Sequence, residues 1–94
     1  MSAYWIAHVT IHNIDQYKNY MQLAPKAFEK FNAQFIARGG RYESLEGESF
    51  EKHVIIKFKD LETAKACYES TEYMLARQQR NGCCDVMINI VEGL

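Results

Sequence analysis

His8 is the residue of this chain best suited to proton transfer. It falls in a stretch, residues 3–11, where side chains of two kinds alternate, so it lies on one face of a predicted strand. Because an imidazole changes its charge near neutral pH, a histidine beside a pocket can exchange a proton with a bound ligand. We therefore predict His8 as the catalytic residue if the protein is an enzyme. The alternative is a buried imidazole hydrogen-bonded to Tyr4, Asn89 or a partner chain.

Arg38, followed by Gly39 and Gly40, is the strongest loop feature. The glycines allow backbone amides to approach an anionic ligand, and the guanidinium of Arg38 can bind that ligand with two parallel hydrogen bonds. We predict Arg38 as a ligand-binding residue. The alternative is that the glycines only bend an edge strand and that Arg38 pairs with a carboxylate such as Glu46.

Four further residues are predicted to bind the ligand because they share the face of His8 or border it. They are Tyr4, Tyr42, His53 and Asn89. A pocket edged by Tyr4, His8, Arg38 and Tyr42 is expected to hold a small anionic or aromatic molecule. His8, His53 and Asp85 share this face, but no ligand spacing such as H-x-H fixes two of them together, so we predict neither a metal site nor a cofactor.

Composition narrows the classes of protein. The chain has 94 residues, which suits one domain over residues 1–94, and a net charge of −1 without a basic patch, which disfavours nucleic-acid binding. No apolar run approaches the roughly 20 residues that span a bilayer, and no secretory signal is visible. Three cysteines, two of them adjacent, make a poor disulfide framework. These features predict a cytoplasmic protein with reduced thiols.

Three alternating stretches must position the candidate residues: 3–11, 52–59 and 84–91. One face of each stretch is wholly apolar, and the other mixes polar and apolar side chains. Such strands form a sheet with one face for the chain's own helices and one amphipathic face. The amphipathic face is too apolar for water, which favours a homodimer packed sheet to sheet.

Helix signals separate the strands. Asn13 or Asp15 can cap a first helix, and Pro25 predicts a kink or two helical pieces. Asp60 and Ser70 are expected to cap two later helical segments. Residues 34–37 look extended, residues 38–40 predict a bulge or bend, and a further strand is expected over 41–46. The order strand, helix, strand, strand, helix, strand predicts the α+β class with a ferredoxin-like β-α-β-β-α-β sheet, and strands one and three at its centre.

The chain resembles a family of short, mostly bacterial proteins of unknown function in the dimeric α+β barrel superfamily. These proteins are distant relatives of antibiotic-biosynthesis-type monooxygenases. The resemblance rests on the order of several short motifs: Tyr4-Trp5-Ile6-Ala7, Asp15 with Tyr17 and Tyr20, Ala37-Arg38-Gly39-Gly40, Leu45-Glu46-Gly47, Phe58 before Leu61-Glu62-Thr63-Ala64, Tyr68-Glu69-Ser70, Glu72-Tyr73 and Val91-Glu92-Gly93. It implies a ferredoxin-like dimer with a cavity between sheet and helices or inside the barrel. The asparagine, tryptophan and histidine pattern of the haem-degrading relatives is not matched.

Two classes of function are compatible with these features. The first is an enzyme carrying out cofactor-independent monooxygenation or isomerisation of a small organic substrate, with His8 moving the proton. The second is a non-catalytic module that binds a ligand or a protein partner. The sequence shows neither a hydrolase triad nor a glycosidase carboxylate pair. The motifs in the sequence therefore do not decide whether the protein is an enzyme.

Overall fold

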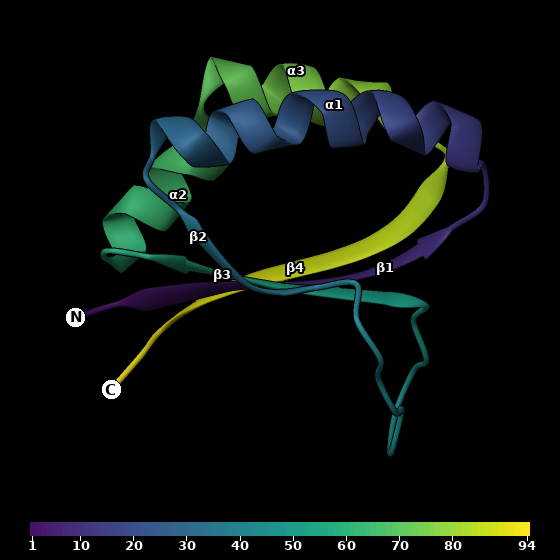
Figure 1. Ribbon diagram of the computed structural model, residues 1–94, viewed down its shortest axis with the longest axis horizontal. Coiled ribbons are helices and arrows are strands. Elements are labelled where there is room, and N and C mark those ends of the chain that lie inside the picture. The colour runs from purple at the N-terminus through teal and green to yellow at the C-terminus, as the bar shows by residue number, and fades with distance from the viewer.

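Four strands and three helices form two layers in the computed structural model, which describes residues 1–94 (Figure 1). The elements in chain order are β1 (Ala3–Ile11), α1 (Ile14–Lys30), β2 (Gln34–Arg38), β3 (Lys52–Phe58), α2 (Leu61–Glu69), α3 (Thr71–Gln79) and β4 (Cys84–Glu92). The strands make one antiparallel sheet in the order β2-β3-β1-β4, and the helices cover one of its faces. The predicted ferredoxin-like α+β fold is confirmed, with β1 and β3 at the centre.

The strand register places His8, His53 and Asn89, as predicted, on the open face, the sheet face that the helices leave uncovered. His8 lies opposite His53 on β3 and Met87 on β4. Ile6 lies between Ile55 and Asn89 in the same way. A shift of one residue would exchange the two faces of a strand, so the alternation of the sequence fixes this register.

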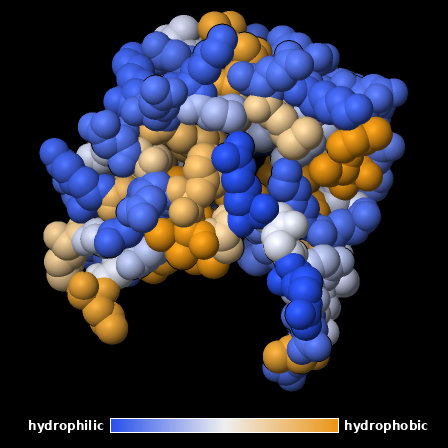
Figure 2. Space-filling view, viewed as in Figure 1, coloured by the Kyte–Doolittle hydropathy of each residue, from blue (hydrophilic) through white to orange (hydrophobic).

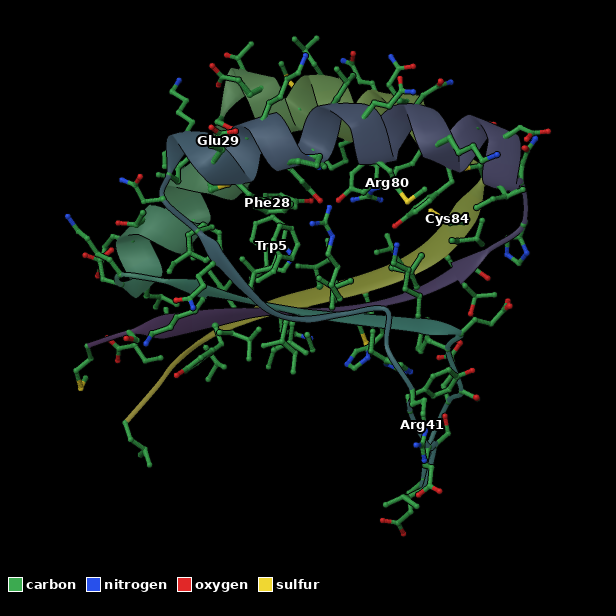
Figure 3. All side chains as sticks on the ribbon, viewed as in Figure 1. Trp5, Phe28, Glu29, Arg41, Arg80 and Cys84 are labelled. Carbon is green, nitrogen blue, oxygen red and sulfur yellow. The ribbon has the colours of Figure 1, made fainter.

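The core lies between the sheet and the helices, and it is built around Trp5. This indole is 1% exposed. Its ring meets the edges of Phe28 from α1 and Tyr73 from α3 at centroid distances of 5.1 and 5.0 Å. Aromatic pairs in edge-to-face geometry add to the free energy gained by burial. The apolar face of β1 is therefore held to both helices, as Figure 3 shows for Trp5 and Phe28.

Helix ends agree with the sequence signals. The side-chain oxygen of Asn13 accepts from the amide of Gln16, and Asp60 does the same for Thr63. Ser70 ends α2 and caps α3, as expected. α1 continues as one element through Pro25, so it is not divided into two pieces. None of the three helices combines the length and hydropathy that crossing a bilayer requires.

The segment after β2 differs from the expectation. No strand forms over 41–46; β2 occupies residues 34–38, and its irregularity lies between Phe35 and Ala37 rather than at the glycines. Residues 41–46 offer few apolar side chains to bury, whereas Phe35 packs against the core. Residues 39–51 instead form an arm that projects from the sheet on the side away from the helices (Figure 1).

Candidate functional site

A cavity of about 70 Å³ lies between the helices and the sheet, and we call it the inner cavity. Its apolar wall includes Trp5 and Phe28, and Tyr17 and Tyr20 of α1 also face it. The charged residues that line it are all cations: Arg38, Lys52 and Arg80. No carboxylate is among its lining residues. The inner cavity is therefore an apolar space with an excess of positive charge.

Arg80 is the one charged residue buried in this protein, with 8% of its surface exposed. It follows the last turn of α3, and Figure 3 shows its side chain beneath α1, whereas Glu29 lies on the outer side of the same helix. The guanidinium lies 4.9 Å from the centre of the Tyr20 ring. Its one side-chain hydrogen bond is a long one, 3.4 Å from Nη2 to the hydroxyl of Tyr73. No carboxylate neutralises it.

Two tyrosine hydroxyls lie beside this guanidinium. The oxygens of Tyr20 and Tyr73 are 2.7 Å apart, a short hydrogen bond between α1 and α3. Burial is the main reason that the pKa of Tyr20 is raised well above its usual value, and the neighbouring Tyr73 adds to the effect. Burial also raises the pKa of Tyr73. Both phenols are thus neutral at ordinary pH and can donate hydrogen bonds.

Arg38 and Lys52 contribute the other two cations of the inner cavity. The guanidinium of Arg38 lies 4.1 Å from the centre of the Phe35 ring, and the ammonium of Lys52 lies 5.3 Å from that of Tyr17. Burial, followed by the charge of Arg38, lowers the pKa of Lys52. A lowered lysine pKa means that the free site disfavours the charge it carries. An anion in the cavity would relieve this.

A second hollow, the outer groove, lies on the β4 side of Arg80 and has a volume of about 540 Å³. Lys65, Arg77 and Arg80 line it, again without a carboxylate. Nη1 of Arg77 donates to the hydroxyl of Tyr68 at 2.7 Å. Because Arg80 lines both spaces, positive charge extends from the inner cavity to the outside of the molecule.

The structure brings together three of the residues predicted from the sequence, His8, His53 and Tyr42, on the open face. The Nδ1 atoms of the two histidines are 2.7 Å apart, and the Tyr42 ring lies 4.6 Å from that of His53. With the arm they line a hollow of about 430 Å³, the open-face hollow. Its charged arm residues are all glutamates: Glu43, Glu46 and Glu48. Nε2 of His53 is buried without a partner.

The other predicted residues lie elsewhere. Arg38 lines the inner cavity, on the opposite side of the sheet from His8. Tyr4 lies near the start of β1, beside Gly93. Asn89 is exposed opposite Ile6. Neither lines the open-face hollow. Asp85 binds His12 at 2.9 Å rather than the histidine pair.

Sequence reasoning did not single out Arg80, and it named Tyr20 and Tyr73 only among the motifs of the family resemblance. A weak signal exists, because Tyr73 and Arg80 are seven residues apart and therefore share a helix face. The decisive feature is the absence of a carboxylate around Arg80, and this depends on residues distant in the chain.

Comparison with known proteins agrees with this architecture. A four-stranded antiparallel sheet covered on one face by helices, with a cavity between the layers, defines the chain as a ferredoxin-like α+β protein. The chain belongs to the DUF1330 family, a domain of unknown function, whose match covers residues 2–94. A search of curated proteins found no match.

Solved structures share the fold at low sequence identity. A protein of unknown function from Rhodopseudomonas palustris has a TM-score of 0.80 and 14% identity, over 99% of this chain and 82% of its own. A dimeric ferredoxin-like protein of unknown function from Jannaschia sp. gives 0.75 and 10%, over 99% and 100%. SnoaB, a cofactor-independent oxygenase from Streptomyces nogalater, gives 0.64 and 6%, over 99% and 93%. These likenesses establish the fold and leave the activity open.

Proposed function

We propose that this protein binds a small organic anion, a carboxylate or similar oxyanion attached to a flat apolar body, with the oxyanion in the inner cavity and the body extending from its open side. The observation that carries the proposal is Arg80, a buried cation with no anionic partner in the protein. A buried charge is expensive unless it is paired. Arg38 and Lys52 add charge of the same sign, and the aromatic wall suits an apolar body.

For the reaction, we propose cofactor-independent oxygenation or isomerisation of the bound anion. The likeness to SnoaB supports the first class at the level of fold. Both reactions can proceed through an electron-rich oxyanion of the substrate, which donors such as Arg80 and Tyr20 stabilise. Lys52, whose pKa is lowered in the free protein, is the lining group best suited to exchange a proton with the substrate. His8 stays a prediction from the sequence, but it lies on the far side of the sheet from this cavity.

We propose further that the protein is a homodimer joined through its open faces. Ile6 and Ile55 pair at the centre of this face, and Met87 and Val91 of β4 are about half exposed beside them. Full burial of a wholly exposed side chain of this kind gains roughly 1.5–3 kcal/mol, and these half-buried side chains gain about half of that. The dimeric relative from Jannaschia sp. has the same fold. In this arrangement the open-face hollow with His8 and His53 is enclosed by the second copy.

A thermal-shift and calorimetric screen with matched probes tests anion binding. Benzoate and salicylate are expected to raise the melting temperature of the protein, and benzamide, the neutral analogue of benzoate, is not. Arg80→Gln should abolish the shift. Arg41→Gln is the matched control because Arg41 lies on the arm, away from the inner cavity (Figure 3). The proposal fails if no carboxylate binds, or if Arg80→Gln binds as tightly as the wild type.

The non-catalytic alternative is separated by turnover. Phenols and lactones that carry a carboxylate are incubated with protein and air, and oxygen uptake and product are followed. Turnover that is lost in Lys52→Gln supports the enzyme. Binding of the probes without turnover of any substrate would instead make the protein a carrier or sensor of the same class of anion.

A further inference from the structure

We propose that the hydroxyl of Tyr20 is the hydrogen-bond donor that recognises the oxyanion of the ligand. A chain of hydrogen bonds, in which Arg80 donates to Tyr73 and Tyr73 donates to Tyr20, orients this hydroxyl. This inference rests on the proposed function, because it names the donor and the recognised group at the same cavity. Tyr20 then contacts the ligand directly, and Tyr73 is a positioning residue.

The direction of the chain begins with Arg80. A guanidinium carries five N–H donors and has no acceptor. The hydroxyl hydrogen of Tyr73 therefore cannot point toward Nη2 of Arg80, which lies 3.4 Å from the Tyr73 oxygen. At this contact Arg80 donates and Tyr73 accepts.

The hydroxyl hydrogen of Tyr73 has one acceptor within reach. Tyr73 is 0% exposed, and its only other side-chain hydrogen-bond partner is the oxygen of Tyr20 at 2.7 Å. A buried hydroxyl that leaves its donor unused loses free energy. Tyr73 therefore donates to Tyr20, and the bond between the two phenols has a fixed direction.

The hydroxyl hydrogen of Tyr20 is consequently left for another acceptor. Its oxygen already accepts from Tyr73, and no other protein group binds it. Tyr20 lines the inner cavity, whereas Tyr73 does not. Its hydroxyl thus presents a donor to the cavity, next to the guanidinium over its ring. Each bond in such a chain polarises the next, so this donor is stronger than an isolated phenol.

The chain also defines the group that is recognised. A carboxylate has two acceptor oxygens and no hydrogen, so one oxygen can bind Arg80 while the other binds Tyr20. An amide of the same shape brings an N–H₂ group against one of these donors. We therefore expect the inner cavity to select planar aromatic or conjugated carboxylates over their amides.

Calorimetric titration with benzoate tests the assignment. Tyr20→Phe should bind benzoate roughly 10- to 100-fold more weakly than the wild type, since it loses a hydrogen bond to a charged acceptor. Tyr73→Phe keeps the Tyr20 hydroxyl but not its orientation, so its preference for benzoate over benzamide should fall while its far-ultraviolet circular dichroism is unchanged. Tyr68→Phe is the matched control, because it removes a phenol that binds Arg77 outside the inner cavity.

The outcomes separate this inference from the function on which it rests. If the wild type and Tyr20→Phe bind benzoate equally, the role of Tyr20 is overturned while anion binding stands. If the wild type binds no carboxylate, the proposed function fails. In that case the direction of the hydrogen-bond chain is tested in the ligand-free protein, by measuring the exchange of the tyrosine hydroxyl protons with solvent in NMR spectra. The Tyr73 hydroxyl should exchange slowly and that of Tyr20 rapidly; the reverse order contradicts the proposal.

Discussion

At the scale of single residues, the informative feature is a charge without a counter-charge. Arg80 is buried, its guanidinium stays protonated in proteins, and the two nearest hydroxyls are neutral phenols. Such a group is destabilising in the free protein unless a ligand completes it. The proposed anion binding accounts for a buried charge that the free protein leaves unpaired.

Replacing the guanidinium with an apolar side chain should reveal that cost. Arg80→Met is expected to leave the free energy of unfolding unchanged or to raise it by about 1–2 kcal/mol, because a buried charge is removed at similar volume. The variant should gain no stability from benzoate. Urea unfolding with and without benzoate measures both effects, with Arg41→Met as control. A benzoate concentration of about 10 mM is in excess for a site with a dissociation constant in the micromolar range. Destabilisation beyond about 3 kcal/mol would show that Arg80 is paired within the protein.

Lys52 gives the inner cavity a pH dependence. Burial, followed by the charge of Arg38, lowers its pKa, so the unfolded chain binds the Lys52 proton more tightly than the folded protein. The contribution of Lys52 to stability therefore rises as pH increases through the lowered pKa. A bound anion has the opposite preference, because it favours the ammonium.

Benzoate affinity should accordingly fall as pH rises, starting below the ordinary lysine value of about 10.4. In Lys52→Arg the fall should disappear, since a guanidinium keeps its proton throughout. Isothermal titration at several pH values measures the trend, and two buffers of different ionisation enthalpy reveal proton uptake on binding. An affinity that is independent of pH up to 10 in the wild type would remove Lys52 from the site.

At the scale of elements, Ser70 joins α2 to α3, the helix that carries Tyr73 and is followed by Arg80. Its hydroxyl donates to the carbonyl oxygen of Cys67 at 2.7 Å and accepts from the amide of Tyr73 at 3.1 Å. One side chain thus ends α2, begins α3 and fixes the backbone at the tyrosine that orients Tyr20. The junction between the helices therefore fixes where the helix that carries Tyr73 begins.

Ser70→Ala should lower the free energy of unfolding by about 1–2 kcal/mol through loss of the helix cap. It should also weaken benzoate binding, because the first turn of α3 carries Tyr73. Chemical denaturation and calorimetry measure the two effects. Ser44→Ala on the arm removes a serine hydroxyl that binds only Ser49, and it should change neither quantity. An unchanged affinity in a clearly destabilised Ser70→Ala would mean that the cap does not position Tyr73.

The elements also show what a sequence can predict. Alternation predicted β1, β3 and β4, because each strand has one face wholly committed to burial, and the succession of strands and helices predicted their order in the sheet. The strand expected over 41–46 was wrong because the only apolar side chains there, Tyr42 and Leu45, are three residues apart and would lie on opposite faces, so neither face has much to bury. The glycines drew attention to Arg38, whose ligand-binding role stays a prediction, and the shared strand face of His8 and His53 agrees with their pairing in the sheet. Arg80 was not found, since its importance lies in which residues fail to surround it.

At the scale of the whole molecule, charge is segregated in a chain whose net charge is −1. Cations line the inner cavity and the outer groove, whereas glutamates line the open-face hollow beneath the sheet. Figure 2 shows the arm as largely hydrophilic with a hydrophobic patch near its end, and Leu45 of the arm is 85% exposed. An anion is attracted to the helical side. The open face, with its apolar centre, is left for a partner.

A single charge at the centre of the open face should therefore separate the proposed dimer. Ile55→Lys places an ammonium beside Ile6, and burying it against a second copy would require its desolvation. Sedimentation equilibrium should give twice 10.9 kDa for the wild type and 10.9 kDa for the variant at micromolar concentration. Leu75→Lys, which adds the same charge on the exposed side of α3, should remain dimeric. A wild type that sediments at 10.9 kDa would refute the dimer. Because one chain supplies every residue of the inner cavity, the Ile55→Lys monomer should still bind benzoate.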